Sequence, residues 1–479
     1  MKRTKKILAA ALGCSLLLTA CGRDATSSSS KQRERTTFQW DFPEENTTFS
    51  FDFNFEINTT TPNQPGTITI VTNPADNPAQ STTTALTTTA VQTTAAATTQ
   101  AQTSKAETVL TTAAVTTTLA ATTTAVTTTY KAGTPEAKLA EMSLRQKVCQ
   151  LFIVTPEQLT GLDRMVEVKA GTRSALKNYP VGGFIYLSQN IYSEDQIKKM
   201  LSDTQTFLKE SCGIGGFTAV DEEGGEIVRV GKNLDVTPVS DMAEYGERND
   251  SDEAFSVGKT LGSNIKKYGF NLDLAPVADV NINDKNELGK RIFSSDPKVV
   301  ANMASNVVKG LKDAGVCSTA KHFPGLGAES GNTHNDSKVV IQRTLEQLRA
   351  TEFVPFKACI DAGVDFIMVG HQITTGFGDN LPGDLSKVAM TDILRGELGF
   401  KGIIITDAQK MNTISKVYSS GTAAKLSIKA GADMILSPSN LNEAVNALIT
   451  AVESGEIPES RIDESVLRIL TLKKKLGLF

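Results

Sequence analysis

The chain has 479 residues, of which 40% are hydrophobic and 21% are charged, and its formal net charge is −4. This slightly acidic balance, without a run of lysine or arginine beyond the extreme N-terminus, argues against a protein that binds nucleic acid by neutralising phosphates. Three histidines, with no CxxC or HxxxH spacing, argue against a dedicated zinc site. A globular mixture of residue types begins only near residue 134, which leaves room for one large domain.

The N-terminus has the pattern of an export signal. Residues 2–6 carry four positive charges, and 7–20 form an apolar run of 14 residues, which is too short to cross a bilayer core of about 30 Å as a helix. The run ends in the letters LTACG, which resemble the lipobox of bacterial lipoproteins, whose cysteine is diacylated. We therefore expect residues 1–20 to be a lipoprotein signal peptide, and a lipid on Cys21 to hold the protein on the extracellular face of the cell membrane. An ordinary signal-peptidase site is the alternative.

Residues 21–133 predict a disordered tether. Between 81 and 130, 23 of 50 residues are threonine and only two are charged, a composition that cannot bury enough apolar surface to offset its ordering entropy. One stretch differs, because apolar and polar residues alternate from 49 to 57, after aromatic residues at 38, 40 and 42. The alternation predicts a strand with one apolar face, which either docks on the edge of a sheet or remains a sticky disordered segment.

The domain expected at 134–479 alternates strand-like and helix-like segments. Eight short apolar runs predict strands, at 148–154, 181–187, 216–220, 272–280, 316–320, 365–369, 402–406 and 432–436. Segments of helical period lie between or after them, at 194–209, 252–268, 298–314, 345–362, 390–398 and 441–454. Eight such units predict an α/β fold of the (β/α)8 TIM-barrel type. A doubly wound open sheet is the alternative, but no GxGxxG motif follows the first strand.

Polar residues follow four of the predicted strands. Asp221 ends the third run, Lys321 and His322 the fifth, His371 the sixth, and Asp407 the seventh. Each alone has a structural explanation, as a helix cap or as a partner of buried carbonyls. Together they predict a site at the carboxyl ends of the strands, where a TIM barrel places its chemistry. All three histidines fall within one 50-residue stretch, which favours the same conclusion.

Four segments carry a family resemblance. The letters AVDEEGGEIVR at 219–229, GKRIFSSDP at 289–297, KHFPG at 321–325 and ELGFKGIIITDA at 397–408 resemble the signature segments of glycoside hydrolase family 3. The resemblance runs from about residue 142 to the C-terminus, and it is closest to the single-domain branch of exo-acting β-N-acetylglucosaminidases. It implies a retaining β-N-acetylhexosaminidase that needs no cofactor and acts on oligosaccharides, such as peptidoglycan fragments or chito-oligosaccharides. We expect a monomer.

The same resemblance implies the site residues. Asp407 matches the nucleophile, a role that suits a carboxylate held on a strand end. His334 matches a proton-transferring histidine on a loop, and Asn332 occupies the position of its partner. The positions that bind the sugar correspond to Asp221, Arg229, Arg291, Lys321 and His322.

Two residues depart from the family pattern. Leu326 replaces a histidine, and Asn332 replaces the aspartate that pairs with the catalytic histidine. An asparagine oxygen can still accept from the imidazole of His334, but it carries no charge to stabilise the imidazolium. Glu329 or Asp336 could substitute for the missing carboxylate if the loop brings one of them close.

Other functions remain open on the sequence alone. The loss of the aspartate at Asn332 favours a surface glycan-binding protein on a decayed enzyme scaffold. A Schiff-base aldolase using Lys321 is a further alternative, although it leaves Asp407 unexplained. Glu222 and Glu223 beside Asp221 could form a calcium cluster, but they belong to the family segment, so we expect no metal. Four cysteines of the domain show no pairing pattern and predict buried thiols.

Overall fold

The structure is a computed structural model that describes residues 32–42, 47–57, 68–71, 130–328 and 331–479. The predicted signal peptide, Cys21, most of the predicted tether and Glu329 lie outside these residues. The chain divides into two units, Met1–Ala120 and Ala121–Phe479, and each is described by itself.

The first unit contains a three-stranded antiparallel sheet, formed by β1 (Gln32–Phe42), β2 (Thr47–Ile57) and β3 (Ile68–Val71) in that order. The strand predicted from the alternating residues at 49–57 is confirmed, since it lies in β2. Its register places Phe51 opposite Phe38 and Phe49 opposite Trp40. The sequence does not predict β1 and β3, and docking of this segment on the globular domain stays a prediction.

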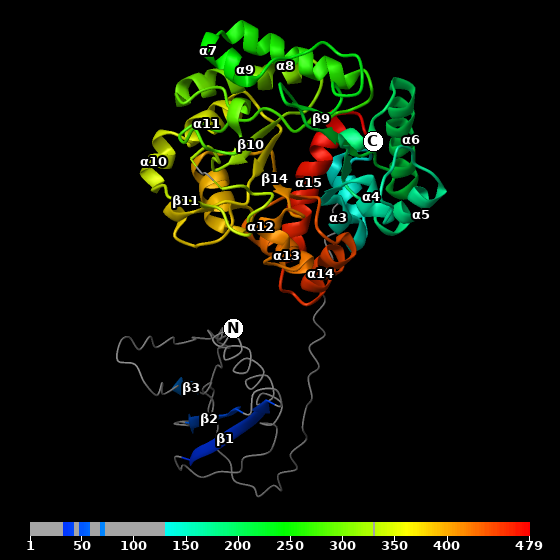
Figure 1. Ribbon diagram of the computed structural model, residues 1–479. Coiled ribbons are helices and arrows are strands. Elements are labelled where there is room, and N and C mark those ends of the chain that lie inside the picture. The colour runs from blue at the N-terminus through cyan, green and yellow to red at the C-terminus, as the bar shows by residue number, and fades with distance from the viewer. Residues whose placement is uncertain (1–31, 43–46, 58–67, 72–129, 329–330) are drawn as a thin grey trace, which may run out of the picture. The chain divides into compact units, whose positions relative to one another are not determined.

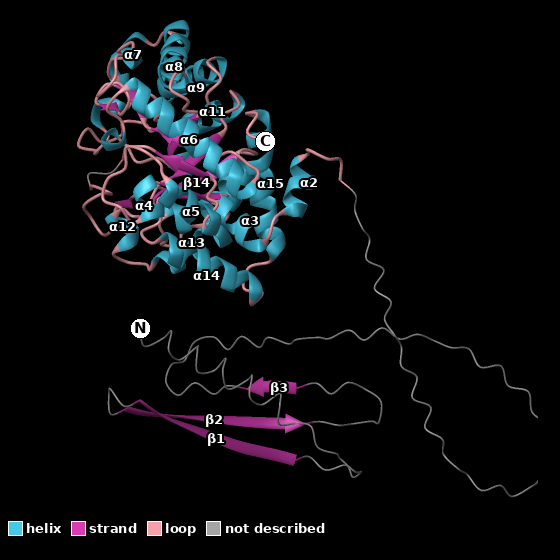
Figure 2. Ribbon diagram, turned by 90° about the vertical axis from the view of Figure 1, so that its right-hand side faces the viewer, coloured by secondary structure: helices cyan, strands magenta, loops and turns pink. Residues whose placement is uncertain are grey.

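The second unit is built on a parallel eight-stranded sheet, and all eight predicted strands are present. Their spatial order is β10-β12-β14-β15-β4-β5-β6-β9. The strands are β4 (Phe152–Val154), β5 (Gly183–Ile185), β6 (Phe217–Val220), β9 (Leu272–Asp273), β10 (Thr319–Phe323), β12 (Phe366–Val369), β14 (Ile403–Ala408) and β15 (Met434–Leu436). Figure 2 shows them at the centre of the unit, with helices outside.

The ring of strands is nearly closed at the seam between β9 and β10. Isolated parallel bridges join Leu272 to Cys317 and Val277 to Lys321. The backbone N–H of Asp273 donates to the carbonyl of Cys317 at 2.9 Å, and that of Ala278 donates to the carbonyl of Lys321 at 2.6 Å. The α/β barrel that the sequence predicts is therefore confirmed, and the open doubly wound sheet is not adopted.

Helices surround the strands (Figure 1). They are α2 (Pro135–Glu141), α3 (Leu144–Gln150), α4 (Pro156–Thr160), α5 (Ala170–Asn178), α6 (Glu194–Cys212), α7 (Met242–Arg248), α8 (Ser251–Lys266), α9 (Pro297–Asp313), α10 (Leu345–Ala350), α11 (Phe353–Asp361), α12 (Asn412–Ser415), α13 (Ser420–Ala430), α14 (Leu441–Glu453) and α15 (Glu459–Lys475). Local sequence fixes their ends, as in α6, where the Ser193 side chain caps the first turn and Gly213 ends the helix at φ 72°. Within the described ranges, every helix is too short or too polar to span a bilayer.

Shorter elements complete the unit. The single-turn helices are η1 (Ser188–Asn190), η2 (Gly289–Arg291), η3 (Thr375–Phe377) and η4 (Gly383–Leu385), and η5 (Val388–Glu397) is a π-helix. Two small ribbons lie beyond the main strands, β7 (Glu222–Gly224) with β8 (Ile227–Val228), and β11 (Val340–Ile341) with β13 (Ile373–Thr374). The four cysteines of the unit are free and buried, as predicted.

Most predicted segments differ from the structure by a few residues at their ends, and three differ more. The run at 148–154 is the end of α3 followed by β4, because a short buried run does not distinguish helix from strand. The run at 272–280 forms a strand only at Leu272–Asp273, before Pro276, which has no N–H to donate to a ladder. The helix predicted at 345–362 is broken between α10 and α11, since Pro355 cannot continue a helix through the carbonyl of Thr351.

Candidate active site

The predicted site residues gather at the carboxyl end of the barrel. Asp221 directly follows β6. Lys321 and His322 lie within β10, and Asp407 is the penultimate residue of β14. Because these strands are parallel and belong to one ring, the side chains at their carboxyl ends face one mouth.

A compact network of charges lies at this mouth. The Lys321 ammonium is 3.0 Å from Asp221 Oδ1 and 2.6 Å from Glu223 Oε1. The Arg291 guanidinium binds both oxygens of Glu223, with Nε at 2.7 Å and Nη2 at 2.9 Å. The side chains of Lys321 and Glu223 are each only 3% exposed, so the two cations and two carboxylates compensate one another away from water. Three of the predicted sugar-binding residues are thereby brought together.

The network fixes the protonation of its members. Burial alone would raise the pKa of Glu223, but Lys321 and Arg291 outweigh it and hold that pKa at about 2. Burial would lower the pKa of Lys321, but Glu223 and Asp221 outweigh it and raise that pKa above its ordinary value. Lys321 is therefore an ammonium at neutral pH, which is unfavourable to the aldolase alternative, since a Schiff base requires a neutral amine.

The acidic segment after β6 is engaged by the protein itself. Glu222 accepts hydrogen bonds from the backbone N–H groups of Arg229, Val230 and Gly231 at 2.8, 2.7 and 2.9 Å. These bonds close the loop that carries Arg229, whose Nε is buried without a hydrogen-bond partner among the described residues. A donor of this kind suits a ligand hydroxyl. The described residues contain no group of three or more metal-binding side chains placed to hold an ion.

His322 is held by a carboxylate that the sequence analysis did not single out. Its Nδ1 lies 2.8 Å from Asp279 Oδ2, and the same carboxylate accepts from the backbone N–H groups of His322 and Leu326 at 3.0 and 2.6 Å. Asp279 is 1% exposed. Leu326, which replaces the family histidine, therefore contributes its backbone to this anchor, and its side chain packs in a small cluster with Val277 and Ile292.

Asp407 is a partly exposed carboxylate among cations. Burial alone would raise its pKa, but His371, His322 and Lys321, with the backbone N–H of Ala408 at 2.6 Å, outweigh it and hold the pKa below its ordinary value. His371 is 2% exposed, its Nε2 is 3.1 Å from the Ala408 carbonyl, and its Nδ1 is 3.1 Å from Asp384 Oδ1. Burial would lower the pKa of His371, but the charge of Asp384 outweighs it and raises the pKa to about 9. His371 is therefore a cation at neutral pH, and its charge stabilises the carboxylate of Asp407.

The loop between β10 and β11 carries His334, and it corrects one expectation. His334 is exposed, and the amide oxygen of Asn332 accepts from the backbone N–H groups of His334 and Asn335, both at 3.0 Å. The expected contact between Asn332 and the imidazole is replaced by a local turn, because asparagine readily binds its own backbone two and three residues on. The Asp336 carboxylate accepts from the backbone N–H of Asn332 at 2.8 Å, so it too is engaged by this turn.

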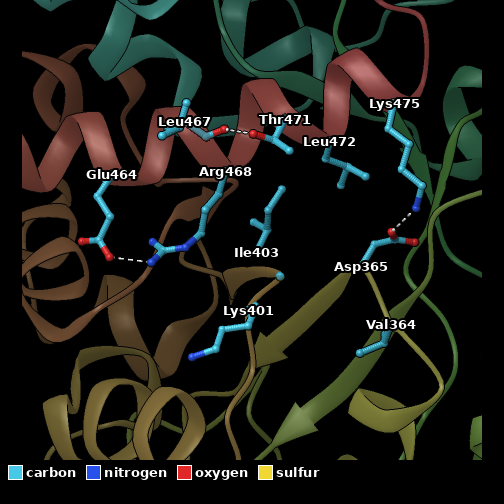
Figure 3. A pocket seen from close by; sticks show the side chains of 11 residues that line it. Val364, Asp365, Lys401, Ile403, Glu464, Leu467, Arg468, Thr471, Leu472 and Lys475 are labelled. Carbon is cyan, nitrogen blue, oxygen red and sulfur yellow. Dashed lines mark hydrogen bonds and ion pairs between the residues drawn. The ribbon is translucent and has the colours of Figure 1, made fainter. Parts of the chain in front are cut away.

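An apolar hollow at the other end of the barrel is separate from these residues. It lies between α15 and the segments that immediately precede β12 and β14, and Figure 3 shows Leu467, Leu472, Ile403 and Val364 around it. Four of its charged residues form two pairs, Lys475 with Asp365 and Arg468 with Glu464. The amino ends of barrel strands usually serve stability rather than chemistry.

Comparison with known proteins identifies the family. Residues 143–472 match the model described as "Glycosyl hydrolase family 3 N terminal domain". The chain belongs to glycosyl hydrolase family 3. It is 31% identical over 283 residues to a beta-hexosaminidase of Tolumonas auensis, a match that covers 59% of this chain and 83% of that protein. A beta-hexosaminidase of Chromobacterium violaceum is 32% identical over 294 residues, covering 60% and 80%.

Solved structures agree. A family 3 beta-N-acetylglucosaminidase from a Paenibacillus species has a TM-score of 0.66 and 34% identity, over 70% of this chain and 63% of that chain. A beta-N-acetylhexosaminidase from Beutenbergia cavernae has a TM-score of 0.62 and 25% identity, over 70% of this chain and 99% of that chain. The resemblance to glycoside hydrolase family 3 is therefore confirmed, and the protein is a glycoside hydrolase. Its lipid anchor stays a prediction.

Several residues of this glycosidase site escape sequence reasoning. Glu223 was considered only as a metal ligand, although it joins the two buried cations. Asp279 lies inside the apolar run at 272–280, and an acidic residue near the carboxyl end of a predicted strand is a signal that could have singled it out. Asp384 lies in η4 and Glu287 in the loop before η2, neither within a motif, so only the fold reveals their contacts with His371 and with the His334 loop.

Proposed function

We propose that this protein is a retaining exo-β-N-acetylhexosaminidase that releases terminal β-linked N-acetylglucosamine from peptidoglycan fragments or chito-oligosaccharides. The observation that carries the proposal is the ionised, partly exposed carboxylate of Asp407 at the same barrel mouth as the network of Asp221, Lys321 and Arg291. The names of the similar proteins, beta-hexosaminidase and beta-N-acetylglucosaminidase, support the choice of sugar.

In the first step, an oxygen of Asp407 attacks C1 of the sugar and forms an ester bond while the glycosidic C1–O bond breaks. The transition state has oxocarbenium character, so a carboxylate near C1 stabilises it before the bond is complete. The low pKa of Asp407 keeps the nucleophile ionised through the neutral range. His334 gives its proton to the departing oxygen.

In the second step, neutral His334 takes a proton from water as the water oxygen attacks C1. The ester bond breaks, Asp407 regains its charge, and the sugar leaves with its original anomeric configuration. The proton taken up in the second step returns His334 to the protonated form with which the next cycle begins.

The sugar hydroxyls are bound by the charged network. Asp221 accepts from hydroxyl donors, while Lys321, Arg291 and the unpartnered Nε of Arg229 donate to hydroxyl oxygens. His322, fixed by Asp279, completes the set. Because the cations are compensated by Glu223 before a ligand arrives, binding a neutral sugar leaves no charge unpaired.

Hydrolysis of p-nitrophenyl β-N-acetylglucosaminide tests the proposal. The wild-type protein should release p-nitrophenol, and Asp407→Ala should lose at least about a thousandfold in kcat/KM, because the covalent route is closed. Saturable binding of the sugar without turnover by the wild type would instead favour the glycan-binding scaffold. Full activity of Asp407→Ala would show that another group is the nucleophile.

The acid role of His334 has a separate test. His334→Ala should lose most activity on substrates with poor leaving groups and least on activated aryl glycosides, since only the former need a proton. Equal losses on both would contradict the role.

We also propose that the enzyme is anchored to the extracellular face of the cell membrane through a lipid on Cys21. The support is the charged N-terminus, the apolar run at 7–20 and the LTACG sequence. In a bacterial host, a clickable fatty acid should label the wild-type protein and not Cys21→Ser. Equal labelling of the two would contradict the anchor.

A further inference from the structure

Resting on the proposed function, the geometry points to Glu287 as a positioning residue that holds the His334 segment at the barrel mouth. Glu287 lies in the connection between β9 and η2. Its carboxylate accepts the backbone N–H of Thr333 at 3.1 and 3.2 Å and the Thr333 hydroxyl at 2.7 Å. Thr333 directly precedes His334, so this bond acts on the backbone from which the imidazole projects.

Thr333 is the buried neighbour of His334 in this loop. It is 4% exposed, whereas every residue from 334 to 338 is exposed. A buried hydroxyl and amide with two carboxylate oxygens as partners form charge-assisted hydrogen bonds, which are stronger than neutral ones. Thr333 is therefore a buried, strongly bonded residue in the described part of the loop, and it is the neighbour of the proposed acid and base.

The same segment is also bound by the chain that follows Asp407. The Thr413 hydroxyl donates to the Thr333 carbonyl at 3.3 Å, and the Asn412 amide donates to the Asn335 carbonyl at 3.4 Å. Both residues lie in α12, which follows β14. Residues 333–335 thus form a clamp between the β9–η2 connection and α12, and Glu287 supplies the charged group of this clamp.

The carboxylate of Glu287 also explains how the loop keeps its place without the family aspartate. The side-chain oxygen of Asn332 accepts from two backbone amides, and the Asp336 carboxylate accepts from the backbone N–H of Asn332. Glu287 is the carboxylate that reaches the residue next to His334 from outside the loop, 46 positions away in the sequence. Removing it should leave the nucleophile and the sugar-binding network unchanged while the position of His334 becomes less defined.

The test compares Glu287→Ala with the conservative Glu287→Gln, which retains an acceptor, and with Thr333→Val, which removes only the hydroxyl donor. Asp284→Asn serves as the matched control, because Asp284 is exposed on the same loop and accepts from Asn281. Each variant is assayed as the purified full-length protein on N,N′-diacetylchitobiose and on 2,4-dinitrophenyl β-N-acetylglucosaminide. Thermal unfolding verifies that each variant is folded.

For Glu287→Ala we expect kcat/KM on the disaccharide to fall by about thirtyfold and kcat/KM on the dinitrophenyl substrate to change by less than about twofold. On the dinitrophenyl substrate kcat should fall, because hydrolysis of the ester needs His334 as a base. Sodium azide, which attacks C1 without a general base, should restore this kcat. Glu287→Gln and Thr333→Val should show the same pattern at about three- to tenfold, and Asp284→Asn should match the wild type.

Equal losses on the two substrates, no loss on the disaccharide, or no response to azide would overturn the inference. If Glu287→Ala does not fold, Glu287→Gln and Thr333→Val decide by the same criteria. If His334→Ala shows leaving-group dependence and azide rescue but the three clamp variants do not, the clamp fails and the proposed function stands. If the wild type hydrolyses neither substrate, the proposed function fails and the clamp with it.

Discussion

The carboxyl group of Asp407 stays ionised because charge outweighs burial, and His371 is the largest source of that charge. His371 is itself held as a cation by Asp384, and its Nε2 lies against the carbonyl of the residue after the nucleophile. A positive charge fixed behind the nucleophile stabilises the carboxylate that must attack, and it also stabilises the carboxylate that leaves when the ester is hydrolysed. His371 therefore supports the proposed chemistry through its charge beside Asp407.

Replacing this cation should change the pH dependence of hydrolysis. In His371→Gln, the amide can still donate to the Ala408 carbonyl, but the pKa of Asp407 should rise because its main compensating charge is gone. We expect the acid limb of the kcat/KM profile to move to higher pH, with a loss of about tenfold at pH 5 and a much smaller loss at pH 7.5. An acid limb that coincides with that of the wild type would contradict this role.

Glu223 should be important for stability as well as for binding. It is the shared partner of Lys321 and Arg291, and Glu223→Gln would leave both cations with reduced compensation in a buried place. We expect the free energy of unfolding to fall by about 3 kcal/mol, measured by urea denaturation. Glu226→Gln, an exposed neighbour, should change it by less than about 0.5 kcal/mol. A similar small change in both variants would be contrary to the prediction.

Sequence patterns can place a site residue when that residue ends or follows a predicted strand. Asp221, Lys321 and Asp407 could be placed at one mouth because each ends or follows an apolar run, and the barrel brings such ends together. The position of Asp279 near the end of a predicted strand marks it as a candidate, but its partner and that of Glu287 lie 43 and 46 residues away, and no sequence pattern reveals these pairings. Asn332 does not contact the imidazole of His334, because its side-chain oxygen accepts from the amides of its own turn, and a catalytic role for Asn332 stays a prediction.

At the scale of elements, the loop after β10 depends on close backbone contact at its base. The Gly327 carbonyl accepts from the amides of Ile282 and Asn283 at 3.1 and 2.9 Å. A Cβ added at Gly327 would lie 2.0 Å from the Val280 carbonyl oxygen, which is backbone and cannot easily move aside. The loop that carries His334 therefore starts from a position that only glycine permits.

Gly327→Ala should consequently displace this loop from the β9 connection. We expect the loss in kcat/KM to be at least about tenfold on N,N′-diacetylchitobiose, because the His334 loop is displaced, and clearly smaller on an activated aryl glycoside. Gly171→Ala, where the added Cβ meets nothing within 4 Å, is the control and should retain full activity. Unchanged disaccharide hydrolysis by Gly327→Ala would show that the loop tolerates the shift.

The succession of elements is more predictable than their bounds. Strong apolar runs located all eight barrel strands, and α6, α8, α9 and α14 follow the predicted helical segments. The helices α5, α13 and α15 were not predicted. The boundary between α3 and β4 was missed because residues 147–154 are all buried, so no change of period marks it. The seam at β9 and β10 needs tertiary contacts that no sequence pattern encodes.

At the scale of the whole molecule, two buried groups should affect stability in opposite directions as pH changes. The pKa of His371 is raised to about 9, so its contribution is complete below about pH 6.5 and is lost as pH rises to about 9. Burial lowers the pKa of Lys473 to about 7 in the folded protein. Between about pH 7 and pH 10.5 the unfolded chain binds a proton at this lysine and the folded protein does not, so stability rises with pH in this range.

Difference curves from urea denaturation separate the two groups. The stability of the wild type relative to His371→Gln should decrease as pH rises from about 6.5 to about 9, by about 3 kcal/mol in all. The stability of the wild type relative to Lys473→Met should instead increase between about pH 7 and pH 10. Flat difference curves would mean that neither group changes its proton affinity on folding.

Covalent trapping tests the central claim most directly. The protein is incubated with a 5-fluoro N-acetylglucosaminyl fluoride, which forms the ester quickly and hydrolyses it slowly, and is then digested and analysed by mass spectrometry. A single adduct of one fluorinated sugar on Asp407, absent from Asp407→Ala, is the result that the account predicts. An unlabelled Asp407, or a sugar attached to another carboxylate, would contradict it.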